Sequence, residues 1–167
     1  MKECFGFTLD QYIFYGGYPG AAPLIHDEDR FSQYIQSAII EATINKDILM
    51  DTPISKPALL RQTFELGAAY SGEILSLNKM LGSLQDAGNT VTLASYINLL
   101  NESGLLCGLQ KYSIDLARRR ASIPKLQVYN NALKMVYSPL TFEEVLVDRK
   151  SWGRIVESCI GAYLVSQ

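Results

Sequence analysis

Thr92-Leu-Ala-Ser-Tyr-Ile-Asn-Leu-Leu-Asn-Glu-Ser-Gly104 and the adjoining Leu105-Leu-Cys-Gly-Leu-Gln-Lys-Tyr112 contain a change from helical to strand periodicity. The first part predicts an amphipathic helix, because its apolar residues recur at helical spacing at Leu93, Tyr96, Ile97 and Leu100. The second part predicts a strand, and residues 125–129 predict its partner across a polar, arginine-rich loop at 115–122. We therefore expect a helix followed by a two-stranded hairpin.

Two further helices are predicted before this stretch. One begins after Ser55 as N-cap and extends toward Gly67, and the next spans about 73–85 with Ile74 on its buried face. Three helices and a hairpin are the arrangement of a winged helix, with the third helix in the recognition position and 115–122 as the wing. We assign residues 55–130 to this winged-helix module.

The flanking segments are also predicted to be helical. Residues 8–15 predict a short helix capped by Thr8, and residues 27–50 predict a long one. After the hairpin, 142–146 predicts a short helix and 152–165 an amphipathic one. The apolar residues of the last helix suggest packing partners beyond Gln167: Ile155, Val156, Ile160, Tyr163 and Leu164. The long helix is expected to bury Phe31, Tyr34, Ile35, Ala38, Ile39 and Ala42. The fold class is therefore α+β and predominantly helical, with an N-terminal helical segment (1–54) packed on the winged-helix module.

Composition restricts the class of protein. The 167 residues are 48% apolar and 19% charged, which is typical of a globular chain, and the net charge of −2 excludes a globally basic nucleic-acid coat protein. Cys4, Cys107 and Cys159 are widely separated, so we expect reduced thiols without a disulfide framework or zinc site. Neither a membrane span nor a leader is apparent, which predicts a cytoplasmic protein without membrane contact.

No complete catalytic or nucleotide-binding motif is present. The nearest match to a phosphate-binding loop is Gly67-Ala-Ala-Tyr-Ser-Gly72, where Glu73 stands in place of the required lysine. His26 is the single histidine and has no partner at metal-ligand spacing. We predict that this chain alone is not an enzyme and has no catalytic or metal-ligating residues.

The basic loop is the strongest candidate for binding. Residues 55–130 hold eight Lys and Arg against five Asp and Glu, a net charge of +3, whereas the remainder holds seven against twelve, a net of −5. The candidate nucleic-acid contacts are Lys111, Arg118, Arg119, Arg120 and Lys125. The recognition-position helix, however, has no Lys or Arg and would present Thr92, Ser95, Asn98 and Asn101. A solvated or protein-facing wing is the alternative.

Nearly the whole chain, from residue 3 to about 165, resembles a known family region. The stretches that carry the resemblance are Gly16-Gly-Tyr-Pro-Gly20, Ile44-Asn-Lys-Asp-Ile-Leu49, Leu59-Leu-Arg61, Tyr70-Ser-Gly72, Leu77-Asn-Lys-Met-Leu-Gly82, Asp86-Ala-Gly-Asn-Thr90, Tyr96-Ile-Asn-Leu-Leu100, Gly104-Leu-Leu106 and Leu109-Gln-Lys-Tyr112. In this order and spacing they resemble the region C-terminal to the P-loop domain in prokaryotic AAA-family ATPases, a domain of unknown function.

The resemblance implies where chemistry would lie in a complete protein. ATP and Mg would bind a preceding P-loop domain, and this chain would itself hold no cofactor. Residues 131–167 would be the start of a truncated restriction-endonuclease-like domain, with Gly153 and Glu157 in its first helix and Glu157 as a vestige of the nuclease site. Many members place an aspartate after the second wing strand, where this chain has Asn130-Asn131. That difference weakens a nuclease function.

The sequence thus predicts a non-catalytic accessory fragment of a putative AAA-family ATPase. Its partners would be its own P-loop ATPase domain and either DNA or a protein, and a homo-oligomer is a further option. Two alternatives stay open. One is a free-standing winged-helix DNA-binding regulator, and the other is a protein-interaction or oligomerisation module.

Overall fold

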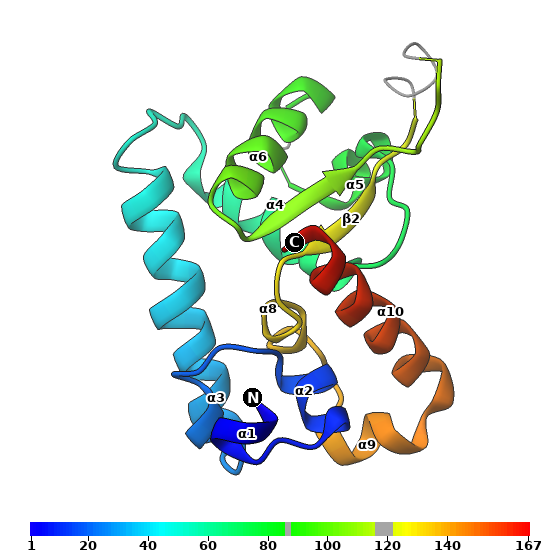
Figure 1. The fold of residues 1–167 in the computed structure, drawn as a ribbon. Helices are drawn as coiled ribbons and strands as arrows, with labels where there is room; N and C mark the ends of the chain where they lie inside the picture. The colour runs from blue at the N-terminus through cyan, green and yellow to red at the C-terminus, as the bar shows by residue number, and fades with distance from the viewer. Residues whose placement is uncertain (86–87, 116–121) are drawn as a thin grey trace.

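The computed structural model describes residues 1–85, 88–115 and 122–167. These residues form an α+β fold that is mostly helical, as predicted, with one small antiparallel sheet (Figure 1). Its N-terminal elements are α1 (Lys2–Phe5), α2 (Leu9–Tyr15), η1 (Ala22–Leu24), α3 (Glu28–Tyr34), η2 (Ile35–Glu41) and η3 (Thr43–Ile48). The central elements are α4 (Pro57–Ala69), α5 (Leu77–Ser83), α6 (Thr90–Glu102), β1 (Leu106–Leu109) and β2 (Lys125–Val128). The C-terminal elements are α8 (Ala132–Met135), α9 (Phe142–Val147) and α10 (Arg149–Val165).

The predicted long helix is present as the consecutive elements α3, η2 and η3, which lie along one side of the molecule (Figure 1). Its buried face differs from the prediction: Ala38 is exposed, and the buried residues are Phe31, Ile35, Ile40, Ile44 and Ile48. The cause is the π-type hydrogen bonding of η2 and η3, in which an N–H reaches back five residues. Each such turn contains more residues than an α-turn, so the buried positions move along the sequence.

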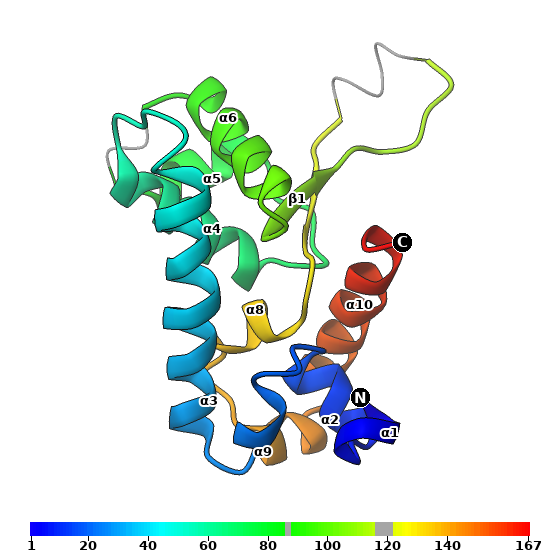
Figure 2. The ribbon, with the colours of Figure 1, turned by 60° about the vertical axis from the view of Figure 1, so that its left-hand side comes forward.

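The third helix and the hairpin agree with the prediction. Asn89 caps α6 by accepting from Thr92 N at 2.9 Å, and the buried residues of α6 are Leu93, Tyr96, Ile97 and Leu100. Strands β1 and β2 pair antiparallel, with Leu106 opposite Val128 and Leu109 opposite Lys125. Strands β1 and β2 pack on α4, α6 and α10, and residues 110–115 and 122–124 extend outward from them (Figure 2).

The segment before α5 is extended, not helical as predicted. Gly72 N donates to Leu126 O at 2.8 Å, Leu126 N donates to Glu73 O at 3.0 Å, and Ile74 forms a bridge with Lys125. Gly72 adopts a φ of 85°, which favours glycine, and its backbone turns the chain out of α4 into this pairing. Helix α5 consequently begins only after Ser76, and Ile74 is exposed while Leu75 is buried.

Helix α4 begins one residue later than predicted. Its N-cap is Lys56, without a side-chain cap, and Pro57 occupies the first turn, so the predicted cap Ser55 lies outside the helix. Gly67 packs against Leu106 of β1, so closely that a Cβ at residue 67 would come within 2.3 Å of Leu106 Cδ2. The backbone of α4 can therefore approach the sheet.

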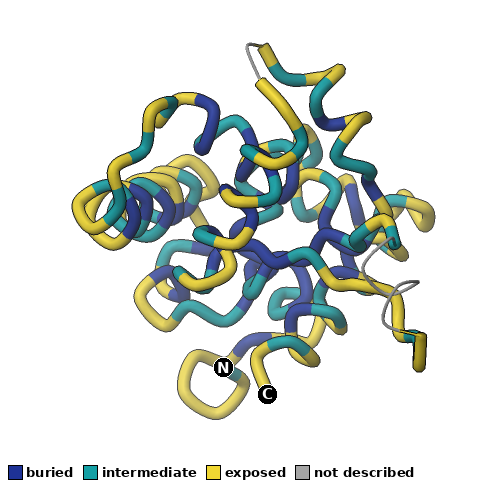
Figure 3. The backbone as a smooth tube through the Cα atoms, turned by 90° about the horizontal axis from the view of Figure 1, so that it is seen from above, coloured by how far each residue is buried: buried dark blue, intermediate teal, exposed yellow. Residues whose placement is uncertain are grey.

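The C-terminal elements pack back onto the rest of the chain. Helix α10 contacts β2, α2 and α9, and α8 lies between the long helix and α10 (Figure 2). The predicted segments 1–54, 55–130 and 131–167 all contribute to one hydrophobic core, which extends in sequence from Phe7 to Ile155. The buried residues gather at the centre of the molecule when it is viewed along its long direction (Figure 3).

Two further features concern helix length and the cysteine side chains. Within the residues that the structure describes, no helix combines the length and apolar content that crossing a membrane requires. All three cysteines are free thiols: Cys4 is exposed, Cys159 is partly buried and Cys107 is buried.

Candidate functional site

A buried polar cluster fastens α10 to β2. Ser71 Oγ and Ser158 Oγ are 2.8 Å apart, and Ser71 Oγ also accepts from Val128 N at 3.1 Å. Gln127 Nε2 donates to Val128 O and Ser158 O, both at 2.9 Å, and its Oε1 lies against Gly161. These hydrogen bonds fix the orientation of the side chains because breaking them would leave further buried groups unpaired. Gln127 Oε1 is buried without a hydrogen-bond partner in the part of the chain that the structure describes. The cluster therefore sets where α10 lies beside the hairpin.

Asn130 and Asn131 fasten the same region to α2. Asn130 Oδ1 accepts from Gly17 N at 3.3 Å and from Ala132 N at 3.1 Å, and Asn131 Nδ2 donates to Ile13 O and to Ile155 O. Gly16 has a φ of 72°, and a Cβ there would come within 2.0 Å of Asn130 Oδ1. The Gly16-Gly17 and Asn130-Asn131 pairs, which are more than a hundred residues apart in sequence, thus contact each other.

The end of the hairpin nearest its loop carries a shallow apolar groove. It is lined by Ile74, Leu109, Gln110, Lys111, Ser122, Ile123 and Lys125, and encloses about 590 Å³. We call it the hairpin groove. Further out, Tyr112 and Ile114 are 88% and 91% exposed. Exposed apolar side chains in one place are typical of a surface that contacts another macromolecule.

The predicted basic residues do not form one patch in the described part of the hairpin. Lys125 Nζ forms an ion pair with Glu157 Oε1 of α10 at 2.6 Å. Lys111 is exposed at the edge of the hairpin groove. Arg118, Arg119 and Arg120 lie outside the described residues. The structure thus brings together two residues that the sequence assigned to different sites, Lys125 and Glu157.

The outward face of α6 is polar and uncharged over most of its length. Ser95, Asn98 and Asn101 are exposed, and Thr92 is partly exposed. Asn101 Oδ1 accepts a hydrogen bond from Tyr129 Oη at 2.8 Å, so this amide is already engaged by the residue after β2. Asn98 is the remaining asparagine on the predicted base-reading face.

Glu157, the predicted vestige of a nuclease site, lies exposed on α10. Its side chain is 58% exposed and forms the ion pair with Lys125. In residues 1–85, 88–115 and 122–167, no three His, Cys, Asp or Glu side chains gather in a way that could hold a metal ion. Metal-assisted cleavage normally uses several such ligands. His26, the single histidine, is exposed.

Sequence reasoning missed the polar cluster. Ser71, Gln127 and Ser158 lie in three separate segments, and each reads as an ordinary polar residue. One signal was present: Gln127 stands at the centre of a predicted strand, between apolar neighbours, where the burial pattern favours an apolar residue. Gly161, inside a predicted helix, was the second signal, because glycine there lowers helix stability unless packing requires it.

The protein is thus a mostly helical α+β protein whose C-terminal helix α10 is held on β2 by buried hydrogen bonds. A family model, described as domain of unknown function DUF8612, matches residues 6–144, and the chain belongs to that family. The comparison with curated proteins gives no match, and the comparison with solved structures gives none either.

Proposed function

We propose that this chain is a non-catalytic interaction module with winged-helix architecture, accessory to an AAA-family ATPase, and that its hairpin side contacts a protein partner. The order of elements supports the winged-helix assignment. Helix α4, the extended residues 72–74, then α5, α6 and the β1–β2 hairpin follow one another, and residues 72–74 pair with β2. A sheet edge and three helices in this order form a compact platform that presents a hairpin.

The observation that carries the choice of a protein partner is the hairpin groove. Its apolar walls are Ile74, Leu109 and Ile123, with exposed fractions of 69%, 38% and 53%. Protein interfaces are built around such apolar centres with a polar rim, whereas DNA contacts depend on unpaired cations. Lys125, a candidate cation at this groove, is already paired with Glu157.

The proposed partner is the P-loop ATPase domain that the family resemblance implies. In this arrangement ATP and Mg bind the ATPase domain, and the present chain transmits the nucleotide state through the hairpin. The proposed restriction-endonuclease-like identity of residues 131–167 stays a prediction, as does the cytoplasmic location.

The experiment is a binding measurement between this chain and the P-loop domain encoded with it. Ile74→Ser/Ile123→Ser should weaken the association at least tenfold, because each substitution removes an exposed apolar contact without opening the core. Val91→Ser is the matched control, since Val91 is 75% exposed on α6, outside the groove. An unchanged affinity in the double variant, or no P-loop domain encoded in the same gene or a neighbouring one, would refute the proposal.

A second candidate, duplex DNA, is favoured by the charge of residues 55–130 and by Lys111 beside the groove. A labelled duplex titrated at two salt concentrations tests it, because phosphate contacts weaken steeply with salt. If DNA binds, Arg118→Ala/Arg119→Ala/Arg120→Ala should weaken binding, and Glu157→Gln should strengthen it by releasing Lys125. Absence of binding at low salt eliminates this candidate.

A further inference from the structure

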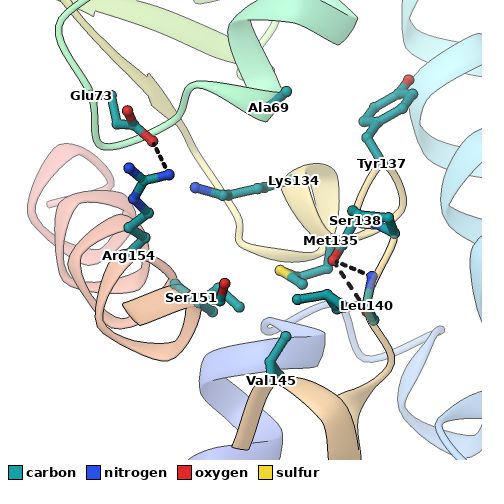
Figure 4. A pocket seen from close by; sticks show the side chains of 12 residues that line it. Ala69, Glu73, Lys134, Met135, Tyr137, Ser138, Leu140, Val145, Ser151 and Arg154 are labelled. Carbon is teal, nitrogen blue, oxygen red and sulfur yellow. Dashed lines mark hydrogen bonds and ion pairs between the residues drawn. The ribbon is translucent and has the colours of Figure 1, made fainter. Parts of the chain in front are cut away.

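A cavity separate from the hairpin groove lies where the C-terminal end of α4 meets α8, α9 and α10. It has a volume of about 240 Å³ and is lined by twelve residues (Figure 4). Its apolar wall includes Met135, Leu140, Val145 and Ile155. Three charged side chains, Glu73, Lys134 and Arg154, lie together on the other side (Figure 4). The cavity thus has one apolar and one charged end, as small-molecule sites commonly do.

Lys134 is held in place by a neutral partner. Its Nζ donates to Ser71 O at 2.8 Å, and within the described residues no carboxylate oxygen lies within 4.0 Å of it. Burial lowers the pKa of Lys134, and the nearby Glu73 carboxylate offsets part of that effect. An ammonium in this setting retains two N–H donors and gains from an additional anion.

Arg154 is only loosely engaged. Its Nη1 lies 3.6 Å from Glu73 Oε1, a long ion pair, and the two side chains are 55% and 34% exposed. The Glu157 carboxylate also acts on Lys134, but it does not line the cavity and is paired with Lys125. Among the residues that line the cavity, two cations face one carboxylate, so the lining has one net positive charge. A monoanion would neutralise it, whereas a dianion would reverse its sign.

We propose that this cavity binds a small organic monoanion, a carboxylate with a short apolar tail, whose charged end lies between Lys134 and Arg154. The tail packs on Met135, Leu140 and Val145. The volume corresponds to about eight water molecules, or to a carboxylate of about six carbons. Because the walls come from α4 on one side and from α8 to α10 on the other, the bound molecule joins the three-helix part to the C-terminal helices. This site is independent of the hairpin groove.

The probe is hexanoate, with hexan-1-ol and inorganic phosphate as reference compounds, titrated into the full chain and followed by amide chemical shifts. Hexanoate should bind with a dissociation constant of about 1 mM or lower and shift amides of residues around the cavity. Hexan-1-ol and phosphate should each bind at least tenfold more weakly than hexanoate, since hexan-1-ol lacks the negative charge and phosphate lacks the apolar tail. Equal binding of the alcohol or of phosphate would overturn the proposal, as would the absence of cavity shifts.

Charge variants test the assignment in both directions. Arg154→Gln should weaken hexanoate binding roughly five- to tenfold, and Glu73→Gln should strengthen it roughly threefold by removing a competing carboxylate. Arg149→Gln, also on α10 but not lining the cavity, is the matched control and should leave the affinity unchanged. Arg154 and Glu73 are part-exposed, so both variants should fold, which circular dichroism can verify. Weaker binding in Glu73→Gln, or an equal loss in Arg149→Gln, would refute the assignment.

Discussion

Replacement of Gly161 by alanine tests whether the polar cluster fixes α10 on the sheet. An added Cβ would come within 2.0 Å of Gln127 Oε1 and 2.6 Å of its Cδ. Gln127 cannot readily rotate away, because its Nε2 is bonded to Val128 O and Ser158 O and its side chain is buried. Overpacking of this kind typically costs about 1–3 kcal/mol.

Gly153 provides a matched control on the same helix. A Cβ at residue 153 would have no neighbour within 4 Å, and the residue is exposed. Both substitutions gain about 1 kcal/mol of helix propensity, so that gain cancels in the comparison. We expect Gly153→Ala to be more stable than the parent chain, and Gly161→Ala to be about 1–3 kcal/mol less stable than Gly153→Ala.

Urea unfolding followed by circular dichroism measures both variants. A double variant, Gly161→Ala/Gln127→Ala, should recover part of the loss, because the overlapping side chain is gone, although Ser158 O then loses its donor. Equal free energies of unfolding for Gly161→Ala and Gly153→Ala would show that α10 does not pack on Gln127 as described, and would refute the reasoning.

Three further predictions concern buried or partly buried groups. Burial raises the pKa of Tyr18 to about 12. The stability that neutral Tyr18 contributes is therefore complete below the unfolded pKa near 10 and is lost as the pH rises toward 12. Tyr18→Phe should reduce alkaline unfolding in an absorbance titration, and an unchanged profile would contradict this. Burial raises the pKa of the Cys107 and Cys159 thiols. Ellman's reagent should therefore modify exposed Cys4 quickly, partly buried Cys159 more slowly and buried Cys107 only on unfolding, and three equal rates would be inconsistent with the fold. Ser158→Ala should lower the free energy of unfolding by about 1–2 kcal/mol, because it removes the hydrogen-bond partner of Ser71. The control Ser37→Ala, at an exposed residue, should leave the free energy of unfolding nearly unchanged, and equal effects of the two substitutions would argue against the polar cluster.

Local patterns predicted the elements whose burial follows a single period. Helix α6 is the clearest example: its four buried residues are those expected from helical spacing, and Asn89 caps it. The strands around Leu106 and Leu126 were also predictable, because an apolar run followed Gly104. In each case one segment contains the whole signal.

Two elements could not be predicted because their conformation depends on partners or on a change of helix type. Residues 73–75 continue an apolar helical pattern in sequence, yet the backbone groups of residues 72–74 pair with β2, more than fifty residues later. The π-type turns of η2 and η3 are equally invisible to a count at 3.6 residues per turn. The buried face consequently moved from Ala38 to Ile40.

The candidate site was predicted only in its parts, and the pairing of Lys125 with Glu157 shows why. From the sequence, Lys125 was predicted to contact phosphates as part of the wing, and Glu157 was predicted to be a vestige of a nuclease site. These two predictions give the two side chains different ligands and do not bring them together. The packing of Gly161 on Gln127 instead brings α10 alongside β2, where the two side chains meet at 2.6 Å. Exposed pairs of this kind contribute little stability, typically below about 1 kcal/mol, so the contact is a consequence of how α10 is fastened and not its cause. A ligand that binds the Lys125 ammonium or the Glu157 carboxylate must therefore compete with the weak ion pair between them. A partner that contacts the uncharged residues of the hairpin groove does not have to break this ion pair.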